Sequence, residues 1–242
     1  MDNDILNNGI KRLRHFGIVE FKNWYFEPVL SMMDIEYLKC FDFYQINTLD
    51  ISPEVIVGTG HSDYNHRTWI EMLGSLKRFL DIDLDETIYN IRHQSYKIKS
   101  VSKYGNDYFI EQANHRLCLS KFLGLDQVNV SVTEHILNEE RYRICNKLKK
   151  HGFDARYLQG EDPYWDFSIG DMMLEIYGSQ LTESFIDYYE SLSLQPKDYR
   201  KYRRSNNLPT NPYQKHKIIS ARDFENVRMQ LLAFKHNLPI YK

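Results

Sequence analysis

Cysteine is scarce in this sequence, and the three that occur lie far apart. Cys40, Cys118 and Cys145 are odd in number and form no C-x-x-C pair, so the sequence predicts neither a disulfide framework nor a zinc knuckle. Long apolar runs and the basic and apolar regions of a signal peptide are also missing. We therefore expect a cytoplasmic protein that does not enter a membrane.

An excess of charge of either sign is absent as well. The 31 lysine and arginine residues nearly balance the 33 aspartate and glutamate residues, which gives a formal net charge of −2. This balance is untypical of a protein that binds nucleic acid over its whole surface. Because 42% of the 242 residues are hydrophobic, the chain can bury a sizeable core in one large domain or two small ones.

The sequence has no Walker motif, since no Gly-Lys-Ser/Thr follows its glycine-rich segment. That segment follows an apolar run and consists of Gly58, Thr59, Gly60 and His61. Two glycines so close together can let backbone N–H groups curl around an anion. His61, Asp63 and His66 could alternatively bind a metal ion, although a loop with this spacing has no fixed geometry. Thr68 and Glu71 then have the spacing of a helix capping box.

The most informative stretch runs from Tyr96 to His135. Its residue patterns predict a strand, a turn, a second strand, a helix and a third strand, at 96–101, 103–107, 108–110, 117–123 and 128–132. Asn114 suits the N-cap of the helix, and Gly124 suits the position after its end. Asn114, His115 and Arg116 therefore lie where a strand passes into a helix. The first backbone N–H groups of a helix and its dipole attract phosphate.

The run from Tyr108, YFIEQANHRLCLSKFLGL, followed by VNVSV, resembles the central element of the ParB/sulfiredoxin superfamily. In that superfamily a strand leads into a Gly-x-His-Arg or Gly-Glu-Arg-Arg box that binds nucleotide phosphates. The resemblance implies a nucleotide or phosphate site made by Asn114, His115 and Arg116. Members include CTP-hydrolysing partition proteins, a sulfinic-acid reductase, free-serine kinases and nucleases, so the fold does not select one reaction.

Two positions depart from the pattern of the superfamily. Ala113 stands where the box has glycine, which restricts how closely the backbone approaches a phosphate. Asn114 stands where sulfiredoxins have their nucleophilic cysteine, and this excludes the reductase activity. Asn-His-Arg also differs from the Glu-Arg-Arg of chromosome-partition CTPases.

We expect an α+β protein built on a ParB/sulfiredoxin-like domain. Its three parts are an N-terminal helical element at 1–39, the ParB/sulfiredoxin-like domain at 40–137 and a C-terminal region of helices and a hairpin at 138–242. Within the first part, apolar residues over 29–38 predict a second helix. The apolar residues from Phe43 to Val57 are expected to form the first strand of the domain.

The predicted hairpin of the C-terminal part carries acids on neighbouring strands. Asp166 or Asp171 lies opposite Glu175, an arrangement that metal-dependent nucleases use. A nuclease of the restriction type has Glu-x-Lys at this place, whereas this sequence has Glu175–Ile176–Tyr177. The missing lysine argues against this activity.

The most basic run is Lys197–Arg204, in which tyrosines alternate with cations. Basic and aromatic side chains together suit a nucleic-acid backbone and its stacked bases. The candidate DNA contacts are Arg200, Lys201, Arg203 and Arg204. A solvated helix end is the alternative interpretation of this run.

Three hypotheses for function remain open. The first is a nucleotide-dependent phosphotransferase or phosphohydrolase that uses a nucleoside triphosphate or diphosphate with Mg²⁺. In it His115 and Arg116 hold phosphate, and Glu111 or Asp63 acts as base or metal ligand. The second is a DNA-associated regulator with a nucleotide switch. The third is a catalytically inert interaction protein, for which Ala113 is the best support.

Overall fold

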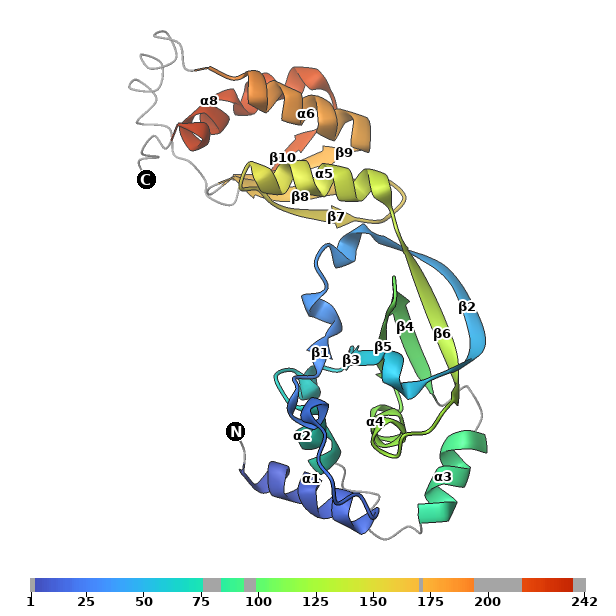
Figure 1. Ribbon diagram of the computed structural model, residues 1–242. Helices are drawn as coiled ribbons and strands as arrows, with labels where there is room; N and C mark the ends of the chain where they lie inside the picture. Colours follow the sequence, from blue (N-terminus) through green and yellow to red (C-terminus); the bar gives the residue numbers. More distant parts are fainter. Residues whose placement is uncertain (1–2, 76–83, 94–98, 170–171, 194–214, 237–242) are drawn as a thin grey trace. The chain divides into compact units, whose positions relative to one another are not determined.

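The computed structural model describes residues 3–75, 84–93, 99–169, 172–193 and 215–236. The chain forms two compact units, Met1–Leu137 and Asn138–Lys242 (Figure 1). Each unit combines helices with a mixed β-sheet, so the protein belongs to the α+β class. Among the described residues, no helix has both the length and the apolar character that crossing a membrane requires.

The first unit contains a six-stranded sheet with the strand order β1-β3-β5-β4-β6-β2. Its strands are β1 (Leu30–Ser31), β2 (Phe41–Ile51), β3 (Ile56–Thr59), β4 (Ser100–Tyr104), β5 (Asp107–Gln112) and β6 (Val128–Leu137). Its α-helices are α1 (Asn3–His15), α2 (Trp69–Gly74), α3 (Leu84–His93) and α4 (Asn114–Phe122), and short 3₁₀ turns join several elements. Strands β1, β3 and β5 run parallel, whereas β4 is antiparallel to β5.

The predicted order of strand, turn, strand, helix and strand in the central stretch is confirmed over the described residues. β4 and β5 form a hairpin whose turn contains Gly105 at φ +60°, a conformation that glycine adopts at little cost. Helix α4 and strand β6 follow in the predicted order. The capping box of α2 is also present, because Thr68 Oγ1 accepts from Glu71 N and the Glu71 carboxylate accepts from Thr68 N. The predicted strand residues 96–98 lie outside the described part of the chain.

Two predictions for the first sixty residues are wrong. The apolar run expected as one strand is divided into β2 and β3 by a turn at Pro53, where Ser52 Oγ accepts from Glu54 N at 3.3 Å. The second helix expected over 29–38 is replaced by strand β1 and two 3₁₀ turns, because Leu30 and Ser31 pair with Gly58 and Thr59. A short apolar run does not distinguish a helix from a buried strand.

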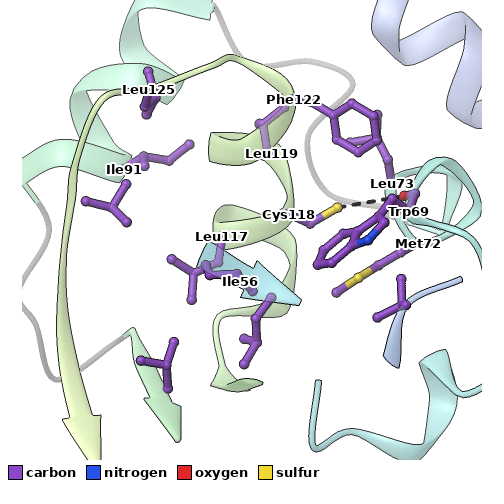
Figure 2. Packing of buried hydrophobic residues seen from close by; sticks show 14 of the residues in the cluster. Ile56, Trp69, Met72, Leu73, Ile91, Leu117, Cys118, Leu119, Phe122 and Leu125 are labelled. Carbon is purple, nitrogen blue, oxygen red and sulfur yellow. Dashed lines mark hydrogen bonds between the residues drawn. The ribbon is translucent and has the colours of Figure 1, made fainter. Parts of the chain in front are cut away.

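The core of the first unit lies between the sheet and helices α1, α2 and α4. Figure 2 shows Cys118 of α4 directed at Trp69 of α2, and Met72, Leu73 and Leu117 belong to the same cluster. Residues Leu13, Phe16, Tyr25 and Val29 belong to the same cluster. The N-terminal element is therefore part of this core rather than a separate appendage.

The second unit contains a four-stranded sheet with the order β10-β9-β8-β7. Its elements are α5 (Glu139–Lys150), β7 (Asp154–Leu158), β8 (Tyr164–Ile169), β9 (Met172–Tyr177), α6 (Ser179–Ser191), β10 (Lys215–Ile218) and α8 (Phe224–Lys235). The predicted hairpin is confirmed as β8 and β9, and the helices expected in this part are present as α5, α6 and α8. Apolar side chains of α5, α6 and α8 form one core with alternate residues of the strands. The basic run Lys197–Arg204 lies outside the described residues.

Candidate functional site

The carboxyl ends of the parallel strands β3 and β5 lie at the same edge of the sheet. Thr59 is in register with Ile110, and Gly60 N donates to Ile110 O at 2.9 Å. Each strand passes at this edge into one of the two polar segments that the sequence predicted as sites. Ligands in α/β sheets bind outside the carboxyl ends of parallel strands, so we expect a ligand site at this edge.

Two side-chain contacts connect the polar segments. Thr59 Oγ1 lies 2.6 Å from Asn114 Oδ1 and also accepts from His61 N at 3.0 Å. The hydroxyl oxygen of Tyr64 lies 2.6 Å from His115 Nε2. Burial raises the pKa of Tyr64, so this hydroxyl keeps its proton at neutral pH. The structure thus brings together the glycine-rich loop and the start of α4.

The helix start differs from the prediction in one respect. Asn114 is the first residue of α4 rather than its N-cap, and its side chain contacts Thr59 instead of the helix amides. The N-cap position belongs to Ala113, which has the left-handed conformation φ 64°, ψ 36° and no side-chain capping bond. A residue with Cβ adopts this conformation at a cost of about 1–2 kcal/mol. Such strain is found most often where the backbone serves a site.

Replacing Ala113 with glycine should therefore not destabilise the protein, unlike most alanine-to-glycine changes. Relief of the left-handed strain, about 1–2 kcal/mol, outweighs or balances the extra chain entropy of glycine, about 0.5–1 kcal/mol. We expect the free energy of unfolding, measured with urea, to stay equal or rise by up to about 1 kcal/mol. Ala233→Gly in helix α8 is the control and should lose about 1 kcal/mol or more. Equal losses in both variants would contradict the assigned conformation.

Two basic residues, Arg116 and Lys99, lie near the first turn of α4. Nη1 of Arg116 is buried and has no hydrogen-bond partner. Lys99 is fully buried, and its ammonium group donates to the carbonyl oxygen of Ile91 near the end of α3. Burial lowers the pKa of Lys99, and the charge of Arg116 lowers it further. A buried N–H group of a cation is costly without an acceptor, so the unpaired Nη1 of Arg116 favours binding of an anion.

A polar cluster lies beside the glycine-rich loop on strands β4, β5 and β6. Ser102 Oγ donates to Glu111 Oε1 at 2.8 Å and lies 3.5 Å from His135 Nε2. The ring of His135 stacks on Tyr104 with the centroids 4.4 Å apart. Burial lowers the pKa of His135, an effect that the Glu111 charge partly opposes, so the imidazole is neutral at pH 7. A Cβ added to Gly60 would lie 3.3 Å from Glu111 Oε2, which places this carboxylate against the loop.

The two predicted acids have different surroundings. Glu111 is held by Ser102, whereas the side chain of Asp63 is 75% exposed and lies 3.8 Å from His61 Nδ1. Both residues are exposed; the Glu111 carboxylate lies against Gly60 and accepts from Ser102, whereas the Asp63 carboxylate lies near His61. Sequence reasoning missed Ser102 and His135. Their alternation with Val101 and Val132 on β4 and β6 is the signal that would place them on the face opposite the core.

Several other polar or reactive residues have structural explanations. Gly58 pairs with Leu30, and a Cβ at Gly58 would lie 2.0 Å from Leu30 O. Cys118 is fully buried with Sγ 3.9 Å from Trp69 O, and burial raises the pKa of its thiol strongly. A thiol in this state is unreactive. In the described part of the chain, no group of three or more His, Cys, Asp and Glu side chains has an arrangement that would hold a metal ion.

Comparison with known proteins adds no assignment to this geometry. No family model, no curated protein and no solved structure matches the chain.

Proposed function

We propose that the first unit contains, at 40–137, a ParB/sulfiredoxin-like domain that binds the phosphate groups of a nucleotide. The observation that carries this proposal is the pair of 2.6 Å contacts, Thr59 with Asn114 and Tyr64 with His115, which hold the glycine-rich loop at the start of α4. The order of strand, box, helix and strand around them is the one that the resemblance implies.

The physical chemistry of this edge suits an anion. The N-cap residue of α4 makes no side-chain capping hydrogen bond, so the first backbone N–H groups of the helix can donate to a bound anion. The Arg116 guanidinium supplies charge, and its buried Nη1 gains a hydrogen-bond partner when a phosphate oxygen binds. Together these groups would offset the charge of a di- or triphosphate.

The proposed reaction is nucleotide-dependent phosphoryl transfer or phosphate-ester hydrolysis. Mg²⁺ would accompany the nucleotide, because this ion is held mainly by phosphate oxygens, water and one or two carboxylates. Glu111 is the acid beside the loop, and it would act as the base that takes a proton from the attacking hydroxyl group. Ser102 would orient this carboxylate through its hydrogen bond.

Calorimetric titration with ATP, CTP, GTP and ADP in Mg²⁺ tests the binding site directly. We expect His115→Ala, Arg116→Ala and Arg116→Lys to weaken nucleotide binding at least about tenfold, or about 1.4 kcal/mol. Arg116→Lys keeps the charge but loses the two-pronged contact with phosphate. All three variants should melt within a few degrees of the parent. Arg14→Ala, an exposed change on α1, is the control and should bind as the parent does.

Two results would contradict this proposal. If the unmodified protein shows neither binding heat nor a rise in melting temperature with any nucleotide, the site does not bind phosphate. A ligand at 100 times its dissociation constant raises stability by about 2.7 kcal/mol, so such binding is readily detected. Variants that bind nucleotide as tightly as the parent would instead show that His115 and Arg116 belong to the scaffold.

A further inference from the structure

One face of the sheet in the second unit carries a row of charged residues in register. Arg156 of β7 pairs with Asp166 of β8, Asp166 pairs with Glu175 of β9, and Glu175 is the register partner of Lys217 of β10. The alternate residues of β8 and β9 belong to the apolar core with α5, α6 and α8. The charged row therefore lies on the opposite face of this sheet.

Glu175 is at the centre of the row and is paired with lysines from β10. Its side chain is only 7% exposed; Oε1 lies 3.0 Å from Lys215 Nζ and Oε2 lies 4.0 Å from Lys217 Nζ. The hydrogen bond to Glu175 raises the pKa of Lys215, and the charge of Asp166 contributes to the same shift. Both lysines and both acids therefore belong to one cluster.

Asp166 lacks the partners that Glu175 has. Its Oδ1 is buried and makes no hydrogen bond. Its cross-strand neighbour on β9 is the like-charged Glu175, at a position where carboxylates repel each other, and its neighbour on β7 is the exposed Arg156. A buried carboxylate oxygen without a donor is costly unless a cation or hydrogen bond satisfies it. A divalent cation between Asp166 and Glu175 would satisfy this oxygen and relieve the repulsion.

We propose that Asp166 and Glu175 bind a divalent cation, Mg²⁺ or Mn²⁺, and that Lys215 and Lys217 bind the phosphodiester of a DNA strand for hydrolysis. Two carboxylates suffice for Mg²⁺, which keeps several waters and takes phosphate oxygens as further ligands. The lysine that is missing after Glu175 in the sequence is supplied by β10, the neighbouring parallel strand. This site lies wholly within the second unit and does not depend on nucleotide binding by the first.

The reaction has a simple balance. A water molecule, activated by the cation that Asp166 and Glu175 would hold, would lose a proton to solvent and attack phosphorus, so that a new P–O bond would form. The bond from phosphorus to the leaving sugar oxygen breaks, and that oxygen takes a proton from water. The net reaction consumes one water and yields a phosphomonoester and an alcohol. The cation would replace Lys215 on Glu175, and the lysine ammonium groups would then face the charge that develops on the phosphate.

The test uses the full chain, with Mn²⁺ titrated by calorimetry and supercoiled plasmid DNA as substrate in Mg²⁺ or Mn²⁺. Bis(p-nitrophenyl) phosphate serves as a small diester that reports the chemistry without DNA binding. Asp166→Asn should weaken Mn²⁺ binding at least tenfold and reduce DNA nicking at least a hundredfold. Lys215→Gln should keep Mn²⁺ binding and lose nicking. Asp187→Asn, an exposed change on α6, is the control and should change neither.

The variants also separate this site from a structural ion pair. Mn²⁺ should raise the melting temperature of the unmodified protein but not that of Asp166→Asn. Asp166→Asn keeps the shape of the side chain, so a loss of Mn²⁺ binding in this variant is not caused by a loss of the fold. Absence of Mn²⁺ binding at millimolar concentration would overturn the proposal. Nicking by Asp166→Asn at the parent rate would do so as well, since a contaminating nuclease or another site would then be responsible.

Discussion

Gly58→Ala should lower the free energy of unfolding by about 3 kcal/mol or more, the effect of forcing an atom into a closely packed backbone. A Cβ at this position would lie 2.0 Å from Leu30 O, 2.7 Å from Leu30 C and 2.9 Å from Phe109 Cδ1. The first two atoms are backbone atoms of β1, which is held in register by its pairing with β3. No side-chain rotation relieves this clash, so β1 must separate from the sheet.

Urea unfolding of the full chain measures this loss, and the transition of the first unit is the one to follow. Gly160→Ala is the matched control, because nothing lies within 4 Å of the added atom and its φ is not left-handed. It should unfold within about 0.5 kcal/mol of the parent. Equal stability of both variants would mean that Leu30 and Gly58 do not pair as described. The result also distinguishes two reasons for glycine at position 58. If glycine is needed for packing, Gly58→Ala lowers stability; if it is needed for phosphate binding, the variant changes nucleotide affinity and not folding.

Patterns that span a few residues predicted local structure correctly. Alternation of Val128, Val130 and Val132 marked β6, and the Thr68–Glu71 spacing marked the start of α2. Each of these signals acts through backbone geometry or a hydrogen bond within one element. The hairpin of β4 and β5 and its glycine turn belong to the same class. Such features need no knowledge of which segments meet in space.

Features that depend on pairing between distant segments were not predictable. Asn114 has the chemistry of an N-cap, but Thr59, 55 positions earlier, contacts its side chain. Strand β1 has two residues, too few to show any periodicity, and exists because β3 offers it backbone partners. The lysine beside Glu175 comes from 40 positions later in the chain. Parallel strand pairing joins segments that no adjacent sequence signal connects.

The candidate site combines both kinds of information. The sequence named the glycine-rich loop and the start of α4 separately, and the fold supplied the contacts between them. It also distinguished Glu111 from Asp63, which sequence reasoning had left as equal alternatives. The polar face of Ser102 and His135 became visible only once β4 and β6 were known to be neighbours.

Glu111→Gln is expected to reduce turnover about 10²–10⁴-fold, the usual contribution of a positioned general base. Glutamine keeps the size of the side chain and can still contact Ser102 Oγ, but it cannot take a proton from the attacking hydroxyl. The dissociation constant for nucleotide should change by less than about threefold, because the groups proposed to hold phosphate lie on α4 and the glycine-rich loop. The melting temperature should also stay close to that of the parent.

Phosphate release from ATP, CTP and GTP in Mg²⁺ measures turnover with water as the acceptor, and transfer to added alcohols is followed by chromatography. Asp63→Asn is the matched control, since the side chain of Asp63 is 75% exposed and lies 3.8 Å from His61 Nδ1. Ser102→Ala should lower turnover less than Glu111→Gln does, because it loosens the base without removing it. If Glu111→Gln retains parental turnover, or if Asp63→Asn loses as much, Glu111 is not the base. If the unmodified protein binds nucleotide but shows no turnover, the proposed phosphate site stands and the catalytic role of Glu111 is rejected. The two results are separable because binding requires α4 and the glycine-rich loop, whereas catalysis also requires the carboxylate on β5.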